Sequence, residues 1–367
     1  MQRLDTIELF IKLLSYCSIT PNDDGVLSFI RDYLKDYEAE WIDKEGVKNL
    51  FLYKKFKDGA HLCFAGHIDV VPPGDGWSSN PFVPKCKDGY IYARGTQDMK
   101  SGVCAFVQAC KDAKEFNGTL SLLLTSDEEG DAKHGTQEVL KFLQEKDFLP
   151  DFAIVAEPTC EKIFGDSIKI GRRGSINGII EVLGKQGHVA YPKKALNPIH
   201  KTAQVLPKVA GVDLDEGDEF FAPSKFVITD IRSGIEATNV TPEKLKMMFN
   251  VRNNTKTSKE DVEEFVDRYF KDVNYTLSLS QSANPFMTDK NSKIVKVITS
   301  AIKNVANVDT KYSTAGGTSD ARFLAKMGVD VVEFGVINDT IHAPNERTTI
   351  KEVEDLKVIF DEVIRNF

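Results

Sequence analysis

Long apolar runs are missing from this sequence of 367 residues. No stretch approaches the ~18 consecutive apolar residues that a membrane-spanning helix needs. The first fourteen residues, MQRLDTIELFIKLL, form an amphipathic helical pattern with acidic residues inside it, unlike the uninterrupted apolar core of a signal peptide. We therefore expect a cytoplasmic protein with no membrane partner.

Basic runs and paired cysteines are also scarce. The 47 lysines and arginines are outnumbered by 55 aspartates and glutamates, which gives a net charge of −8 and argues against nucleic acid as the partner. No C-x-x-C pair occurs among Cys17, Cys63, Cys86, Cys104, Cys110 and Cys160. Free thiols in a reducing compartment are expected, rather than a disulfide framework.

Short apolar runs alternate with helical patterns in the first half of the chain. The spacing predicts strands at 49–53, 61–66, 119–126 and 151–157, with helices at 100–116 and 135–146. Such alternation is typical of an α/β domain with a mostly parallel sheet and helices on both faces.

The rhythm changes near residue 174 and returns near residue 286. Between these points strands dominate, with predicted helices at 197–210 and 258–273. A helix near 291–305, a strand at 330–336 and a helix at 350–366 then restore the α/β pattern. We predict a discontinuous catalytic domain, residues 1–173 and 286–367, interrupted by a smaller α+β domain, residues 174–285.

Potential metal ligands follow the apolar runs of the predicted catalytic domain. They are His67 with Asp69, Asp98, Glu128 with Glu129, Glu157 and His342. The first four groups lie about 30 residues apart, the length of one βαβ unit. Because open α/β sheets build their sites at the carboxyl ends of the strands, we expect these side chains to converge.

Two histidines and several carboxylates in one place carry too much charge to be buried unpaired. Two divalent cations about 3.5–4 Å apart and sharing one carboxylate would balance it. We assign Asp98 as the bridge, His67 and Glu157 to one ion, and His342 and Glu129 to the other. Asp69 is predicted to accept the second ring N–H of His67 and so to fix its tautomer.

Glu128 is then the carboxylate that neither ion requires. Beside a metal-activated water, it is placed to take the proton of the attacking water and pass it to a leaving amine. The chemistry predicted from these residues is metal-assisted hydrolysis of an amide.

The motifs that carry these residues also resemble a known family. They are GHIDVVPPGD, YARGTQDMKSG, TSDEEG, AEPT, GRRGS, GKQGHVAYP, GGTSDARF and HAPNE, in order along nearly the whole chain. The sequence resembles the dinuclear zinc aminoacylase/carboxypeptidase family. The resemblance implies a catalytic α/β domain, an inserted α+β lid through which the protein forms a homodimer, and two Zn²⁺ per subunit that Co²⁺ can replace.

The resemblance also implies roles for residues of the inserted domain and nearby loops. His188 would reach the active site of the partner subunit and stabilise the tetrahedral oxyanion. Substrate contacts are implied for Arg172 or Arg173, Asn239, Arg252, Gly317, Thr318 and Ser319. Arginine forks and backbone donors suit a small-molecule N-succinyl amino acid, which carries carboxylates at both ends.

Several alternatives stay open at this point. One alternative substrate is that of an acetylornithine deacetylase or a dipeptidase, and a non-catalytic metal-dependent binding protein is a more distant alternative. D-E-E-G is usually a solvated acidic turn, and a lone histidine is usually structural. The AGGTS segment lacks the Gly-Lys-Ser/Thr ending of a phosphate loop, so an anion nest for a carboxylate is expected there.

Overall fold

The computed structural model describes residues 3–367, which divide into two compact units. Unit 1 comprises Met1–Gly171, Met287–Ser313 and Ser319–Phe367, and unit 2 comprises Arg172–Phe286 and Thr314–Thr318. The predicted N-terminal helix is observed as α1, Thr6–Leu14. Met1 and Gln2 lie outside the described residues.

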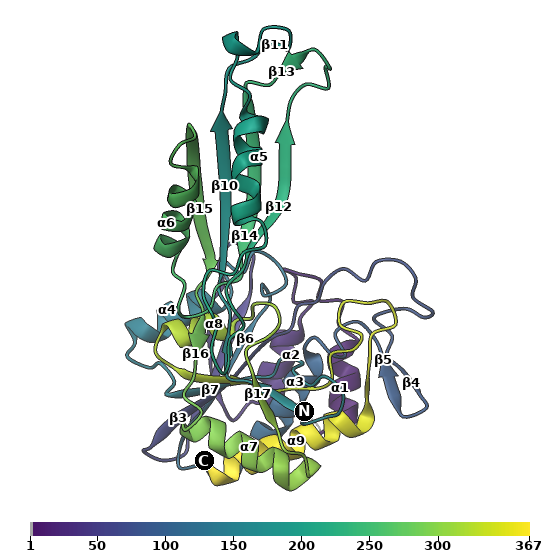
Figure 1. The fold of residues 1–367 in the computed structure, drawn as a ribbon. Helices are drawn as coiled ribbons and strands as arrows, with labels where there is room; N and C mark the ends of the chain where they lie inside the picture. The colour runs from purple at the N-terminus through teal and green to yellow at the C-terminus, as the bar shows by residue number, and fades with distance from the viewer. Residues whose placement is uncertain (1–2) are drawn as a thin grey trace. The chain divides into compact units, whose positions relative to one another are not determined.

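Unit 1 is built on an eight-stranded mixed sheet with the order β1-β2-β6-β3-β7-β18-β8-β17 (Figure 1). The strands are β1 Glu38–Trp41, β2 Asn49–Lys55, β3 Ala60–His67, β6 Gly118–Thr125, β7 Phe152–Val155, β8 Ser167–Lys169, β17 Lys311–Ser313 and β18 Asp330–Glu333. Strands β6, β3, β7 and β18 run parallel to their neighbours in this series. The predicted α/β fold with a mostly parallel sheet is confirmed, but β1 and β2 are antiparallel, which was not expected.

The central strands are buried because both faces of the sheet are covered. Every residue of β6 is buried, and all residues of β3 after Ala60 are buried too. Continuous apolar runs of this kind are what a parallel sheet sandwiched between helices requires.

The helices of unit 1 form a layer on each face of the sheet. Helices α1, α3, α7 and α9 pack together on one face, and α4 and α8 pack together on the other (Figure 1). Their bounds are α3 Lys100–Asp112, α4 Thr136–Glu145, α7 Lys293–Ala306, α8 Ala321–Lys326 and α9 Ile350–Asn366, and a further helix, α2, spans Val26–Tyr33. Helix α1 begins with a capping box, in which the Asp5 carboxylate accepts from Glu8 N–H and the Glu8 carboxylate accepts from Asp5 N–H.

A small antiparallel sheet of order β19-β5-β4 also belongs to unit 1. Its strands are β4 Lys85–Lys87, β5 Tyr90–Tyr92 and β19 Arg347–Thr349. Because β5 pairs with β19, the segment that follows β5 lies beside the segment that precedes β19. Two distant parts of the sequence are thereby brought together.

Unit 2 contains a four-stranded antiparallel sheet with the order β12-β14-β10-β15. Its main elements are β10 Ser175–Leu183, β12 Phe226–Ser233, β14 Lys244–Val251, β15 Tyr275–Ala283, α5 Pro198–Val209 and α6 Lys259–Phe270. Both helices pack with alternate residues of the strands in one apolar core. This core includes Ile180 and Phe249 from the strands and Phe270 from α6. This pattern is typical of a sheet with one face covered by helices.

Short elements complete the chain. Strands β11 Gly187–His188 and β13 Val240–Thr241 pair with each other in unit 2, and a 3₁₀ turn, η1, spans Pro192–Lys194. Strands β9 Gly171–Arg172 and β16 Phe286–Met287 stand where the chain passes from one unit to the other. Within residues 3–367, no helix is long and apolar enough to cross a membrane, and all six cysteines are free.

Candidate metal centre

Three neighbouring parallel strands deliver the first set of predicted ligands to one edge of the sheet. Strand β3 ends at His67, which is paired in register with Thr125 at the end of β6. Glu128 and Glu129 follow β6 directly, and Glu157 follows β7, which pairs with the other side of β3. The carboxyl ends of adjacent strands therefore bring these side chains together, as expected.

Asp98 and His342 reach the same place by another route. From the sequence, Asp98 was expected to follow a strand of the large sheet. It stands instead in the segment after β5 of the small sheet. His342 stands between β18 and β19, with a φ of 59° in the left-handed region. The apolar run YIY has strand character in either sheet, so its letters do not reveal which sheet it joins.

Asp98 lies at the centre of the cluster. Its Oδ1 is 3.1 Å from His67 Nε2, and its Oδ2 is 3.1 Å from His342 Nε2. His342 Nε2 is also 3.0 Å from Glu129 Oε1, and His67 Nε2 is 3.8 Å from Glu157 Oε1. One carboxylate thus faces two imidazoles, and each imidazole has a further carboxylate of its own.

The charges of the cluster shift the pKa values of both histidines. Hydrogen bonds to Asp98 and Glu129 raise the pKa of His342 to about 10. Burial opposes charge on His67, but the hydrogen bond and charge of Asp98, together with the charges of Asp69 and Glu128, outweigh burial and raise the pKa of His67 well above its usual value. The cluster therefore favours positive charge at its centre.

The pKa values of the carboxylates in the cluster are shifted as well. Burial, followed by the charge of Asp98, raises the pKa of Glu157 well above its usual value. Burial also acts on Asp98, but hydrogen bonds from His342 and His67 outweigh it and lower its pKa. Candidate ligand atoms of His67, Asp98 and Glu129 all lie within 4.8 Å of one another. Imidazole nitrogen and carboxylate oxygen at this spacing are a donor set that fits divalent metal ions.

Asp69 contacts His67 most closely through its backbone oxygen. His67 Nδ1 is 2.9 Å from the backbone oxygen of Asp69 and 3.6 Å from its carboxylate. The fully buried carboxylate instead accepts the backbone N–H groups of Glu128 and Glu129, at 3.4 and 3.1 Å. Asp69 therefore orients the imidazole with its backbone and holds the Glu128–Glu129 segment with its side chain.

Glu128 is partly buried next to the ligands. Burial raises the pKa of its carboxyl to about 8, and the charges of Asp320, Asp98 and Glu129 act in the same direction. A carboxyl group with a pKa near neutrality can both accept and release a proton under working conditions.

The remaining predicted site residues belong mostly to unit 2. His188 is exposed in β11 and accepts the backbone N–H of Ala190 at its Nδ1. Asn239 accepts Val189 N–H through its backbone oxygen, and Arg252 is exposed. In the part of the chain that the structure describes, none of these residues belongs to the group of candidate metal ligands.

Of the two arginines, Arg172 contacts the loop that leads into the GGTS segment. Arg172 is buried and donates from Nη1 to the carbonyl of Ala315, 3.1 Å away, so it lies against the loop that contains Gly317 and Thr318. Arg173 is less buried than Arg172. Ser319 belongs to unit 1, where its hydroxyl donates to buried Glu333 at 2.6 Å, so its side chain is used in the interior.

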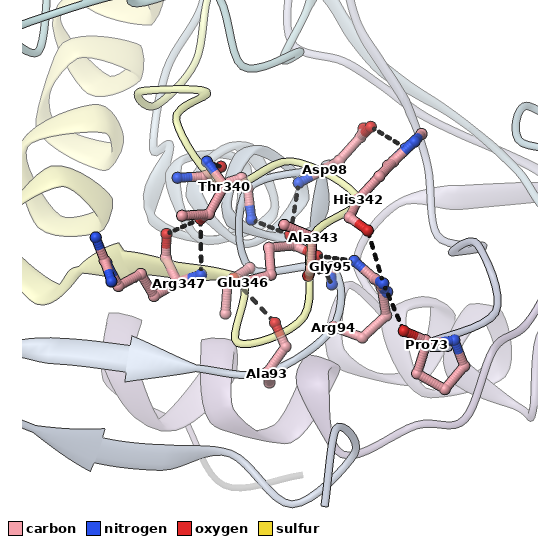
Figure 2. Close-up of polar contacts among 12 residues, drawn as sticks. Pro73, Ala93, Arg94, Gly95, Asp98, Thr340, His342, Ala343, Glu346 and Arg347 are labelled. Carbon is pink, nitrogen blue, oxygen red and sulfur yellow. Dashed lines mark hydrogen bonds and ion pairs between the residues drawn. The ribbon is translucent and has the colours of Figure 1, made fainter. Parts of the chain in front are cut away.

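Sequence reasoning gave no role to Arg94 and Glu346, which form a buried ion pair of 2.7 Å beside the cluster (Figure 2). Both stand inside motifs that carry a ligand, YARGTQDMKSG and HAPNE. The sequence shows a positive charge, Arg94, in one motif and a negative charge, Glu346, in the other. The two residues are too distant in sequence for this to suggest that they form a pair.

Comparison with known proteins agrees with this geometry. The chain matches the model of Peptidase family M20/M25/M40 over residues 63–366. It is 70% identical over 364 residues to the succinyl-diaminopimelate desuccinylase of a Nitratiruptor species, covering 99% of this chain and 100% of that protein.

Solved structures share the fold. The aminopeptidase PepT of Bacillus cereus matches with a TM-score of 0.82 and 20% identity, over 98% of this chain and 97% of that one. The YXEP protein of Bacillus subtilis, described as a dinuclear metal binding peptidase from the M20 family, matches with a TM-score of 0.74 and 15% identity, over 99% and 98%. By the extent of the family match and the identity to its relative, this chain belongs to peptidase family M20/M25/M40.

Proposed function

We propose that the chain is a two-zinc amidohydrolase that converts N-succinyl-LL-2,6-diaminopimelate to succinate and LL-2,6-diaminopimelate, in lysine and peptidoglycan-precursor biosynthesis. The observation that carries the proposal is the cluster itself, in which Asp98 faces both His67 and His342 with Glu128 alongside. The substrate is inferred from the relative in Nitratiruptor, which is 70% identical over its full length.

The ligand assignment follows the distances within the cluster. Asp98 is proposed to bridge the ions, one held also by His67 and Glu157 and the other by His342 and Glu129. When bound, such ions supply Lewis-acid activation of the amide carbonyl and of water. Zinc suits these ligands, and Co²⁺ is expected to substitute for it.

Glu128 is proposed to move the proton. It takes a proton from the attacking water and delivers it to the nitrogen of the leaving amine, so that the C–N bond breaks as the amine becomes neutral. A carboxyl pKa raised to about 8 suits the second step, in which the protonated form is needed. Asp69 supports both steps by holding the backbone of the Glu128–Glu129 segment.

Unit 2 is proposed to supply substrate contacts and the dimer interface. We assign residues 174–285 as the dimerisation domain, and residues 1–173 and 286–367 as the catalytic domain. Arg172 or Arg173, Asn239, Arg252 and the loop at Gly317, Thr318 and Ser319 are proposed to bind the substrate. Arginine forks match its carboxylates.

A homodimer is supported by exposed apolar side chains. Among residues 3–367, eight of the fifteen exposed large hydrophobic residues belong to unit 2, although unit 2 is the smaller unit. Val227 and Ile231 lie on the edge strand β12, and Val189 and Tyr191 lie near β11. We propose that a second copy covers this surface and that His188 acts in the active site of the partner subunit. The free thiols support a reducing, cytoplasmic setting.

The test is hydrolysis of N-succinyl-LL-diaminopimelate beside N-acetylornithine, with chelated and zinc-restored protein. Zinc-dependent release of succinate, with little release of acetate, is the expected result. Release of acetate alone would keep the mechanism and replace the substrate by that of an acetylornithine deacetylase. No hydrolysis of either compound by zinc-loaded protein would contradict the proposal and favour a binding protein.

A further inference from the structure

The buried ion pair of Arg94 and Glu346 joins the segment that carries Asp98 to the segment that carries His342 (Figure 2). Arg94 is 1% exposed and Glu346 is fully buried. Their shortest contact, between Nη1 and Oε2, is 2.7 Å long. Neither residue belongs to the cluster of candidate metal ligands.

The Glu346 carboxylate organises the turn before Asp98. Its Oε1 accepts the backbone N–H of Gln97 at 2.7 Å and that of Asp98 at 3.2 Å. Its Oε2 accepts the backbone N–H of Gly95 at 3.1 Å, in addition to Arg94. All four partners are donors, so the carboxylate acts as an acceptor at every contact.

The Arg94 guanidinium performs the complementary task on the other segment. Its Nη2 donates to the carbonyl of His342 at 3.2 Å and to that of Pro73 at 3.2 Å, and its Nη1 donates to Ala343 at 3.4 Å. His342 has a left-handed backbone conformation, which is costly for a residue with a side chain and persists only when the surroundings hold it.

Other contacts also join the two segments. Strand β5 pairs with β19, and the Gln97 side chain contacts Asp339 and Thr340. Within residues 3–367, the Asp98 N–H donates its hydrogen bond to Glu346, and the His342 carbonyl accepts its hydrogen bond from Arg94. The pair therefore reaches the backbone of both candidate ligands directly.

A buried ion pair is weak evidence for stability, because removing two charges from water offsets much of their attraction. Here five of the seven side-chain hydrogen bonds of the pair go to the backbone of the two candidate ligand segments. Such an arrangement serves orientation, as the outer contacts of metal ligands commonly do.

We propose that Arg94 and Glu346 are positioning residues that set the separation of Asp98 and His342 and thereby the affinity of the metal centre. The inference rests on the proposed metal centre. The ion between His342 and Glu129 depends on both tethered ligands, Asp98 and His342, whereas the ion between His67 and Glu157 depends on Asp98 alone. The first ion is therefore the more sensitive one.

Two conservative variants separate this role from charge or bulk. In Glu346→Gln, the new NH₂ group replaces an oxygen that accepts from two of the four donors, so at least one backbone contact is lost. In Arg94→Lys, the charge stays, but a single nitrogen replaces the fork that reaches Glu346 and three carbonyls.

Lys357→Met is the matched control. Lys357 pairs with Asp112 at 2.8 Å and Asp361 at 2.6 Å, and only 15% of its side chain is exposed. This ion pair joins α3 and α9 and contains no candidate ligand. Its loss tests the effect of removing a largely buried ion pair as such.

The measurement is titration of chelated protein with Zn²⁺ against a competing chelator, which gives a dissociation constant for each ion. His342→Ala serves as the reference that identifies the ion bound by His342. In Glu346→Gln and Arg94→Lys, we expect the dissociation constant of that ion to rise about 10–100-fold, and that of the other ion to change less. Urea unfolding of the chelated proteins measures their stability separately, and Arg94→Lys carries the test if Glu346→Gln does not fold.

The outcomes are distinct. Selective weakening of one ion in the variants, with both constants unchanged in Lys357→Met, supports the inference. If both variants fold and bind both Zn²⁺ ions with the dissociation constants of the wild type, the inference is overturned and the proposed function stays intact. Equal weakening of both ions in the variants and in Lys357→Met would also overturn it, because that is the effect of general loosening. Failure of the wild type to bind two Zn²⁺ would overturn the proposed function itself.

Discussion

Glu128 is the residue at which metal binding and catalysis can be separated. It adjoins Glu129, yet its assigned task is proton transfer, so Glu128→Gln should keep both metal ions. We expect kcat to fall about 10²–10⁴-fold, the usual contribution of a positioned acid or base. Steady-state kinetics together with measured zinc content per chain check this prediction.

Asp131→Asn is the matched control for Glu128→Gln. Asp131 is an exposed acid of the same segment whose partner is Lys133. Its kcat should stay near that of the wild type. Near-normal turnover in Glu128→Gln would show that another group carries the proton.

His61 gives unit 1 a pH-dependent stability. Burial lowers the pKa of His61 from 6.5 to about 4, so between these values the unfolded chain binds a proton that the folded chain does not. The stabilisation is complete above pH 6.5 and is lost as the pH falls towards 4. Its size is about 3 kcal/mol from the shift in pKa.

Comparison with His61→Gln isolates this effect, because a neutral amide does not titrate. Urea unfolding of chelated protein, followed by tryptophan fluorescence, reports on unit 1, since Trp41 and Trp77 both lie there. The wild type should lose more unfolding free energy than the variant between pH 6.5 and 4. Parallel curves would contradict the assigned pKa.

At the residue scale, the sequence predicted the candidate ligands better than their supports. His67, Glu129 and Glu157 were proposed as ligands because their type and their place after a buried strand both point to a site. The contact between Arg94 and Glu346 joins segments far apart in the chain, and no periodicity encodes it. The role of the Asp69 carboxylate was missed because its partners are backbone N–H groups, which every residue except proline offers.

At the scale of elements, helix α3 packs closely against the end of β7. A Cβ added at Gly102 would lie 2.3 Å from the carbonyl oxygen of Ala156, the residue before Glu157. Gly102→Ala must therefore displace this backbone, at a cost of about 1–3 kcal/mol. Urea unfolding should show the loss, and zinc titration should show weaker binding of the ion assigned to His67 and Glu157.

Ser101→Ala is a control in the same turn of α3. The Ser101 hydroxyl is buried without a hydrogen-bond partner among the described residues, so its removal should be close to neutral. Equal stability and zinc affinity in Gly102→Ala and the wild type would show that β7 yields at no cost.

The predicted elements of the parallel core correspond closely to β3, β6, β7, α3 and α4. Their continuous apolar runs and helical periods are strong local signals. Strand direction was less accessible, because an apolar run reads alike in parallel and antiparallel pairs; hence the antiparallel β1 and β2 were not expected. The apolar run of β5 indicated a strand, but it did not indicate that this strand belongs to a second sheet.

At the scale of the whole molecule, the proposed exchange of His188 between subunits makes a quantitative prediction. His188→Ala and Glu128→Gln homodimers should each be nearly inactive. A heterodimer of the two has one complete active site, so an equal mixture with exchanged subunits should recover about a quarter of wild-type activity.

Activity measured before and after subunit exchange checks this prediction. An equal mixture of His188→Ala and wild-type chains is the control for activity lost during the exchange procedure, because it should keep half of wild-type activity before and after exchange. Absence of recovery in exchanged Glu128→Gln and His188→Ala chains would place His188 in the active site of its own subunit. A monomer in sedimentation experiments at the assay concentration would contradict the dimer.

Strand β18 lies between β7 and β8 in the large sheet, although it follows both by more than a hundred residues. On the ribosome, the first 171 residues emerge well before the strand that fills this gap and before the loop that carries His342. Unit 1 can therefore complete its sheet only near the end of translation, while the continuous segment Arg172–Phe286 of unit 2 has already emerged. A chain that stops short of β18 exposes the buried edges of β7 and β8. We expect chaperones and proteases to bind such a chain, and we do not expect it to retain reduced activity.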